Sequence, residues 1–357
     1  MFGRFADALV KEIRLRADEM SDDVNTLYIG GGTPSVLPLY VYERVLQALK
    51  DAGHGGPYDE FTVEVNPEDI VDKGETYVEG LLKLGVNRIS MGVQSFDDGI
   101  LKFMNRRHDA DTARKAYAIL EKAGVGNISI DMIFGLPQLS DGQWQDTLDK
   151  ALSISPSGRP PQHISSYQLS VEPGSMLARL VEKGKWSEAS EELCERQYRM
   201  LCETLRNAGY HHYEISNFAL PGFEAKHNSA YWKHVPYIGL GPGAHSFLTY
   251  SRSTQGSGDG DKIFRQWNEP DLGRYLENPT GQQGREELTE EQIVLERIML
   301  ALRTSEGISE SYLREHCSPH ELSHAIASGN LVFKDDGMVR IPEDRFFISD
   351  SIISDII

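Results

Sequence analysis

The chain has 357 residues, with 36 basic and 54 acidic side chains and a formal net charge of −18. This balance argues against nucleic acid and anionic membranes as partners, because phosphate binding requires clustered Lys and Arg. No apolar run is long enough to span a bilayer, and the amphipathic start does not resemble a signal peptide, so we expect a cytoplasmic protein. The three cysteines form no disulfide or Cys-x-x-Cys pattern.

Segments rich in β-branched and aromatic residues recur along the first two thirds of the chain. Predicted strands cover 26–29, 61–65, 88–93, 128–133, 163–169 and 212–215. Helical patterns separate them, and this alternation predicts βα units around a parallel sheet. A polar residue stands at or just past the end of nearly every strand. In a β/α barrel these ends share one rim, where active sites form, so we predict a partial barrel.

Three glycines, Gly30 to Gly32, follow the first predicted strand and precede Thr33 and Pro34. Glycine admits backbone conformations that a side chain forbids and leaves its N–H open to a ligand. Such N–H groups at the end of a strand suit a carboxylate or a phosphate. The segment matches neither the P-loop nor the dinucleotide fingerprint, and a tight turn is the alternative interpretation.

The last third of the chain has a different pattern. Residues 250–286 are poor in periodicity and are predicted to be an irregular linker, with a surface loop at 253–261. A capped helix at 288–304, shorter helices and a two-stranded tail at 331–341 follow. We therefore predict a barrel domain over 1–249 and a small α+β, winged-helix-like module over 287–357. Because that module is acidic, we expect it to pack on the barrel or meet a protein rather than read DNA.

Several ordered motifs resemble those of radical S-adenosylmethionine (SAM) proteins, and the match extends almost from end to end. The closest resemblance is to the oxygen-independent coproporphyrinogen III oxidase family. Two later segments, His227-Asn228-Ser229-Ala230-Tyr231-Trp232 and 239–245, resemble its heme-chaperone branch. The earlier motifs are Gly30-Gly31-Gly32-Thr33-Pro34, Glu64-Val65-Asn66-Pro67, Gly92-Val93-Gln94-Ser95-Phe96 and the segment from Asp131 to Pro137.

The resemblance implies an α/β fold with a partial (β/α)6 TIM-like barrel that lacks its first strand and holds SAM along its rim. It places the methionyl end of SAM at the backbone of Gly31, Gly32 and Thr33. Glu64 would accept from the ribose hydroxyls, since a carboxylate offers two acceptor oxygens to a diol. Further contacts to SAM are implied at Gln94, Arg106, Asp131 and Gln168.

The family reduces SAM with a [4Fe–4S] cluster held by three cysteines in a Cys-x-x-x-Cys-x-x-Cys loop. That loop is absent here, and Cys194, Cys202 and Cys317 have neither its spacing nor its place. We therefore expect no metal site in this chain and no radical chemistry as it stands. A cluster is expected only in an N-terminally extended protein, which the persistence of the SAM-contact residues favours. The alternative is a naturally cluster-less relative.

The leading hypothesis is a heme chaperone that binds heme and SAM and passes heme to an acceptor protein. Its tentative heme residues are His227, Asn228, Tyr231 and Trp232, with His245 as a weaker candidate. An imidazole can ligate iron, and aromatic faces can flank a porphyrin; a capped turn filling a core is the alternative. The other hypotheses are a coproporphyrinogen III oxidase and a cluster-less SAM-binding or interaction protein. Peripheral contact with membrane acceptors and a homodimer are left open.

Overall fold

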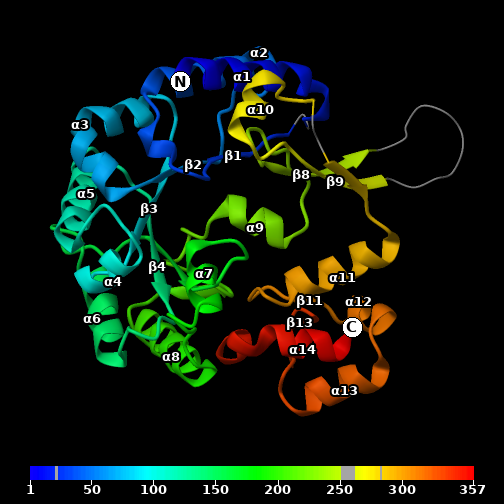
Figure 1. Ribbon diagram of the computed structural model, residues 1–357. Helices are drawn as coiled ribbons and strands as arrows, with labels where there is room; N and C mark the ends of the chain where they lie inside the picture. The colour runs from blue at the N-terminus through cyan, green and yellow to red at the C-terminus, as the bar shows by residue number, and fades with distance from the viewer. Residues whose placement is uncertain (21–22, 251–261, 282–283) are drawn as a thin grey trace, which may run out of the picture. The chain divides into compact units, whose positions relative to one another are not determined.

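The computed structural model describes residues 1–20, 23–250, 262–281 and 284–357 (Figure 1). The predicted surface loop at 253–261 lies outside these residues. The chain folds into two compact units, each assembled from separate segments. Unit 1 comprises Met1–Tyr28, Val36–Phe61 and Lys226–Ala301, and unit 2 comprises Ile29–Ser35, Thr62–Ala225 and Leu302–Ile357. These units are interleaved along the sequence, so the domain boundaries predicted above stay a prediction.

The main sheet has seven strands in the order β1-β2-β3-β4-β5-β7-β6. The first five predicted strands are confirmed within about two residues at their ends. Strands β2 to β5 are parallel and adjacent in sequence order, which is the topology of a partial β/α barrel. Their bounds, with that of β1, are β1 Thr26–Ile29, β2 Glu60–Val65, β3 Arg88–Gln94, β4 Ile128–Phe134 and β5 His163–Gln168.

The sixth predicted strand is present as β6 (His211–Glu214), but it does not pair with β5. The short strand β7 (Asn217–Ala219) lies between them and is antiparallel to both. Two residues connect β6 to β7, so the chain turns back as a hairpin before another helix can form. β6 therefore still runs parallel to β5, as a further βα unit, and the insertion of β7 between them is a change that the strand pattern alone did not reveal.

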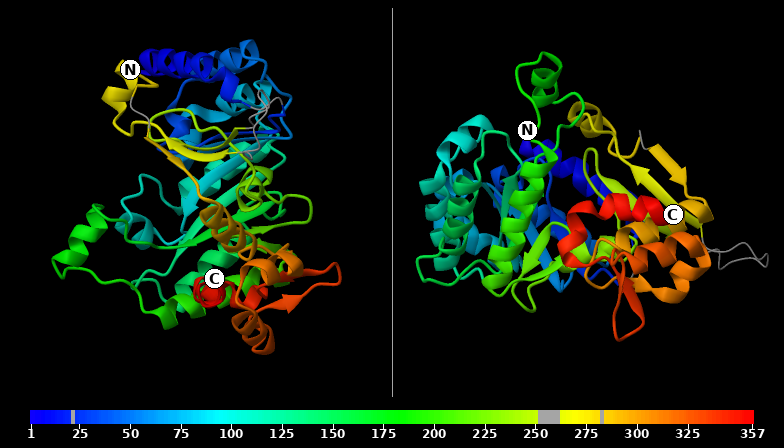
Figure 2. Two further views of the ribbon diagram at one scale, coloured as in Figure 1. Left: turned by 90° about the vertical axis from the view of Figure 1, so that its right-hand side faces the viewer. Right: turned by 90° about the horizontal axis from the view of Figure 1, so that it is seen from below.

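Helices connect the parallel strands of unit 2, and α3 and α5 lie side by side along one face (Figure 2). Side-chain caps define where several of them begin. Ser140 accepts from the backbone N–H of Gln143, whose side chain in turn accepts from the N–H of Ser140, a reciprocal capping box. The helices are α3 Pro67–Lys83, α4 Asp98–Phe103, α5 Ala110–Lys122, α6 Asp141–Leu152, α7 Met176–Glu182 and α8 Glu191–Asn207.

In unit 1, α1 (Phe2–Leu15) and α2 (Leu39–Asp51) pack side by side. Val10, Ile13, Ala48 and Leu49 form the buried core between them. Three further helices belong to this unit: α9 Lys226–Trp232, α10 Leu272–Glu277 and α11 Glu290–Ala301. The predicted cap of α11 is confirmed, because Thr289 accepts from the N–H of Gln292 and the Gln292 side chain accepts from Thr289.

Part of the segment predicted to be an irregular linker is ordered as secondary structure. Strands β8 (His245–Tyr250), β9 (Lys262–Trp267) and β10 (Gly284–Glu287) form a three-stranded antiparallel sheet. The interpretation of 250–286 as wholly irregular is therefore wrong for β9, α10 and β10. The strand Lys262–Trp267 is only six residues long, and its apolar residues Ile263, Phe264 and Trp267 do not alternate with polar ones, so it does not stand out beside its Gly- and Ser-rich neighbours.

The C-terminal segment of unit 2 contains the small sheet that the sequence predicts, with one more strand. Strands β11 (Ile308–Ser309), β13 (Met338–Arg340) and β12 (Val332–Phe333) are antiparallel in that order. Helices α12 (Glu310–His316), α13 (Pro319–Ala327) and α14 (Ser349–Ile356) accompany the sheet. This arrangement confirms a small α+β module of winged-helix type. Short 3-10 turns occur at Ala17–Glu19, Pro34–Val36 and Glu343–Ile348.

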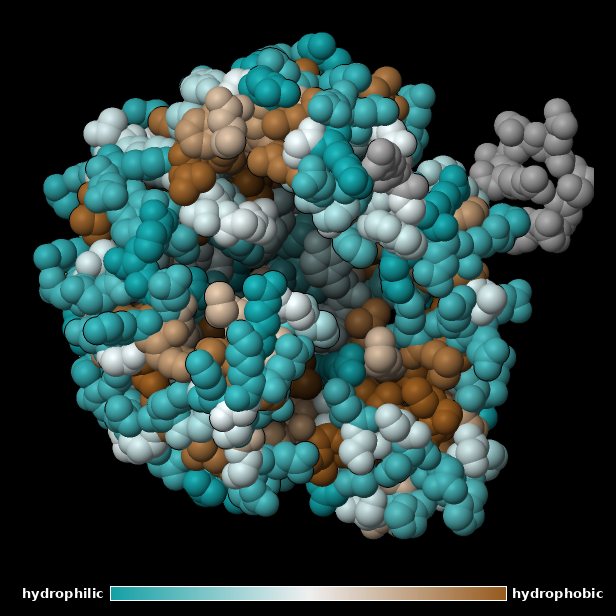
Figure 3. Space-filling model, in the orientation of Figure 1, coloured by the Kyte–Doolittle hydropathy of each residue, from teal (hydrophilic) through white to brown (hydrophobic). Residues whose placement is uncertain are grey.

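The face of the molecule drawn in Figure 3 is covered mainly by hydrophilic residues, with apolar residues in small groups. This agrees with the high charge of the sequence. Among the residues that the structure describes, no helix combines the length and the apolar character needed to cross a bilayer.

Candidate functional site

The predicted SAM-contact residues all belong to unit 2, and we call them the strand-end site. Gly31 and Gly32 have φ of +76° and +57°, and a Cβ at either position would meet no atom within 4 Å. The backbone here is therefore both left-handed and open, which is what a close approach to a ligand requires. The loop is held in place by Glu64, whose Oε2 accepts from the N–H of Gly31 at 2.9 Å. Thr33 is half-buried beside it.

Asp131 lies on the neighbouring part of the same sheet. Ser90 is paired with Glu64 in the β2–β3 register, and its hydroxyl donates to Asp131 at 3.1 Å. Burial raises the pKa of Asp131 to about 6, while the buried guanidinium of Arg88 opposes this rise and the Glu64 carboxylate adds to it. Two carboxylates that influence each other thus share this end of the sheet, and one of them titrates near neutrality.

Of the remaining predicted contacts, the two glutamines end strands of the sheet, and Arg106 lies between α4 and α5. Burial lowers the pKa of the Arg106 guanidinium, and the charges of Glu68 and Asp131 oppose the shift, so this cation interacts electrostatically with both carboxylates. Gln94 ends β3 with φ of +68°, an uncommon value for a residue with a side chain. Gln168 ends β5 and is exposed. The structure therefore links Gly31, Glu64, Arg106 and Asp131 through contacts or charge, and it places the two glutamines only by strand position.

The predicted heme residue His227 lies in unit 1, at the start of α9, and both of its ring nitrogens have partners. Nδ1 is 2.8 Å from the hydroxyl of Thr26, and Nε2 is 2.8 Å from the hydroxyl of Tyr231. The ring of Tyr28 stacks on the imidazole, with centroids 5.0 Å apart and planes 18° from parallel. The imidazole is therefore fixed on three sides rather than presented alone to a ligand.

A buried carboxylate fixes the start of α9 itself. Glu60 is 4% exposed and accepts from the backbone N–H groups of Lys226 at 2.7 Å and His227 at 3.1 Å. These bonds are charge-assisted and satisfy N–H groups that a helix start leaves without internal partners. We use the name α9 cluster for Thr26, Tyr28, Glu60, His227 and Tyr231.

Sequence reasoning missed Thr26, Tyr28 and Glu60. Thr26 and Tyr28 are two residues apart in β1 and so point to the same face of the strand. Their shared face was the only signal in the sequence. It points to the site only once the fold shows that α9 lies against β1. Glu60 offered a weaker signal, as a charged residue opening an otherwise buried strand.

The other tentative heme residues are placed less closely. Asn228 and Trp232 lie on α9 and are half-buried. Tyr231 is 38% exposed and packs edge-on against Tyr237, and burial raises its phenol pKa to about 12. His245 opens β8 and stacks on its cross-strand neighbour Trp267, an arrangement that strand pairing explains.

The glycine-rich segment 239–245 folds around a buried acidic side chain of α1. Glu12 accepts from the N–H of Gly241 at 2.8 Å and from the hydroxyl of Tyr275 at 2.6 Å. Arg16 pairs with Glu12 at 3.1 Å and donates to the carbonyl of Gly239 at 2.8 Å. A satisfied buried network of this kind fixes one backbone path, which explains the glycine pattern structurally.

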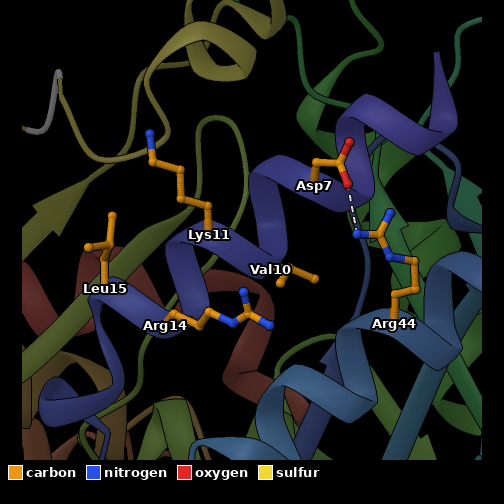
Figure 4. A pocket seen from close by; sticks show the side chains of 6 residues that line it. All are labelled: Asp7, Val10, Lys11, Arg14, Leu15 and Arg44. Carbon is orange, nitrogen blue, oxygen red and sulfur yellow. Dashed lines mark hydrogen bonds and ion pairs between the residues drawn. The ribbon is translucent and has the colours of Figure 1, made fainter.

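A surface cavity of about 330 Å³ lies along α1 and α2 (Figure 4). None of the predicted cofactor residues lines it. Arg44 of α2 pairs with Asp7 of α1 at 2.7 Å. The lining residues are Asp7, Val10, Lys11, Arg14, Leu15 and Arg44.

The cysteines do not form a cluster site. Cys194, Cys202 and Cys317 are buried free thiols, and burial raises the pKa of each. Within the described residues, no group of three His, Cys, Asp or Glu side chains could hold a metal ion. The residues present therefore do not fit an iron–sulfur cluster, whereas the open glycine loop and the acidic strand ends fit SAM.

Comparison with known proteins shows the family and the fold. The family model of the radical SAM superfamily matches residues 2–151. The heme chaperone HemW of Synechocystis is 32% identical over 87% of this chain and 72% of its own length. HemW of Lactococcus lactis is 37% identical over 64% of this chain and 58% of its own length. The solved structure of coproporphyrinogen III oxidase (HemN) from Escherichia coli superposes with a TM-score of 0.77 at 20% identity, covering 99% of this chain and 82% of that one.

The parallel strands, the glycine loop and the acidic strand ends define a partial barrel of radical SAM type. The chain belongs to the HemW family within the radical SAM superfamily. The likeness to the E. coli oxidase confirms the fold.

Proposed function

We propose that this chain is a heme chaperone, which binds heme at the α9 cluster and passes it to an acceptor protein. The observation that carries the proposal is the pair formed by His227 and Tyr231, an imidazole and a half-exposed phenol joined at 2.8 Å. Both groups are ligands that proteins use for heme iron. The names of the relatives from Synechocystis and L. lactis, both heme chaperones, support the same function.

We further propose that SAM binds at the strand-end site. The backbone of Gly31, Gly32 and Thr33 would take its amino-acid end, and Glu64 would accept from its ribose. Gln94, Arg106, Asp131 and Gln168 would supply the remaining contacts. A [4Fe–4S] cluster supplies the electron for radical chemistry in this superfamily, and the described residues offer no donor set for it.

The proposal includes an acceptor protein for the heme and a cytoplasmic location. It also includes peripheral contact with membrane acceptors and a homodimer. The alternative activity, coproporphyrinogen III oxidation, is supported only by a structural likeness at 20% identity, which shows the fold alone. A cluster-less SAM-binding protein is the remaining alternative.

The experiment is a titration of the full chain with hemin, followed by absorption spectroscopy. We expect one equivalent to bind with a distinct spectrum. The double variant His227→Ala/Tyr231→Phe removes both candidate ligands and should lower the affinity by at least about tenfold. The variant His320→Ala is the control, because His320 is an exposed histidine that is not among the candidate heme residues. Equal binding by the double variant would refute the site, and weak, non-stoichiometric uptake by the native chain would refute the function.

A further inference from the structure

Within the proposed heme site, the contacts of the His227 ring indicate which of the two candidate residues can bind iron. His227 has its Nδ1 against Thr26, its face against Tyr28 and its Nε2 against Tyr231. To present Nε2 to iron, the imidazole would have to give up the Tyr231 hydroxyl and turn against the Tyr28 ring. The oxygen of Tyr231 differs, because a hydroxyl that donates its proton to Nε2 still has lone pairs that can bind iron, and 38% of the residue is exposed.

We propose that the phenol oxygen of Tyr231, and not His227, is the ligand of ferric heme iron, an inference that rests on the proposed function. Tyrosinate is an established protein ligand of ferric heme. His227 is then a positioning residue, because it acts on the iron only through the oxygen of Tyr231. Thr26 and Tyr28 hold the imidazole in turn, as outer partners commonly do for ligands of metals.

The proton balance of this coordination follows from the hydrogen bonds. With Tyr231 donating to Nε2, the ring proton of His227 stands on Nδ1 and is donated to Thr26. When the iron–oxygen bond forms, the O–H bond breaks and its proton passes to Nε2, 2.8 Å away. A neutral phenol and imidazole become a phenolate bound to iron and an imidazolium. No oxidant or reductant is required, because the iron remains ferric.

The fixed start of α9 supports the same assignment. His227 and Tyr231 are four residues apart, so their side chains lie on one face of the helix. Glu60 holds the backbone N–H of His227, which fixes the position from which the imidazole reaches the phenol. The edge-on contact with Tyr237 restrains the other side of the Tyr231 ring, with centroids 4.6 Å apart.

The test is hemin binding to the full chain, followed by resonance Raman and electron paramagnetic resonance. We expect iron–phenolate vibrations in the native complex, their complete loss in Tyr231→Phe, and an affinity lowered by at least about tenfold in that variant. His227→Ala should keep the phenolate vibrations with weaker binding. Tyr40→Phe is the control, since Tyr40 is a similarly exposed tyrosine on α2. Tyr231→His should bind hemin with an imidazole signature, which shows that the variants at this position fold.

The outcomes separate the inference from the proposed function. Phenolate vibrations that survive in Tyr231→Phe would overturn the inference, as would a native spectrum of imidazole ligation that His227→Ala abolishes. In both cases hemin would still bind to the chain, and the proposed function would stand. If the native chain does not bind hemin stoichiometrically, the proposed function itself is wrong.

Discussion

Glu60 caps the start of α9, and the free energy lost when this cap is weakened can be worked out from its two hydrogen bonds. Its two carboxylate oxygens accept from the N–H groups of Lys226 and His227. In Glu60→Gln only one oxygen remains, and the amide NH2 that replaces the other is a donor facing a donor. One charge-assisted hydrogen bond is lost, at a cost of about 1.5–3 kcal/mol.

This loss should be local, because it frees one turn of a short helix. Hydrogen exchange of the two amides reports the free energy of opening at that turn. A loss of about 1.5–3 kcal/mol corresponds to exchange that is roughly 10- to 150-fold faster at one of the amides or both. Mass spectrometry of peptides covering 226–232 measures this change directly.

Asp59→Asn is the matched control for the charge. Asp59 precedes Glu60 and lies 3.8 Å from the Nζ of Lys226, but its side chain is 66% exposed. Exposed ion pairs contribute little, so its removal should leave the exchange of α9 unchanged. If Glu60→Gln exchanges as the native chain does, Glu60 does not hold the start of α9, and the assignment of the cluster fails with it.

Three further predictions concern acidic groups of unit 2. Glu64→Ala should weaken SAM binding by about 10- to 150-fold. Glu64→Gln should weaken it by much less, because its amide oxygen can still accept a hydrogen bond from the ribose. Calorimetric titration distinguishes the two variants, and equal effects would contradict the hydrogen-bonding role. Since burial raises the pKa of Asp131 to about 6, SAM affinity should increase as the pH rises through that value, with Asp131→Asn showing no such step. Burial raises the pKa of Glu214 from 4.5 to about 7, so between these values the folded state holds a proton that the unfolded state has lost. The stability contributed by Glu214 should therefore fall as the pH rises from 4.5 to 7, and urea unfolding of Glu214→Gln should not show this fall.

The parallel strands could be predicted from the sequence because each is a short apolar run followed by a turn or polar residue. The same logic placed Glu64 and Asp131 at one edge of the sheet, and the structure connects them through Ser90. The strand order beyond β5 could not be predicted in this way. The pairing of β7 with β5 depends on a two-residue hairpin whose sequence carries no strong turn signal.

The α9 cluster shows the other limit. The sequence indicates His227 and Tyr231 as a pair, but the partners of His227 in β1 and β2 lie 167 to 201 residues earlier in the chain. Contacts at this separation leave no periodic trace, so neither Thr26 nor Glu60 could be assigned to the site. For the same reason the sequence could not show that both nitrogens of the imidazole are engaged, which changes the expected iron ligand.

The central claim is that heme binds at α9, and the most direct test is the position of its iron. Crystals of the chain with bound hemin, measured at the iron absorption edge, would locate the metal by anomalous scattering. The account predicts a single strong iron peak within bonding distance of the Tyr231 oxygen, with His227 still hydrogen-bonded to it. A single peak at any site remote from α9, or several weak peaks on the surface, would contradict it.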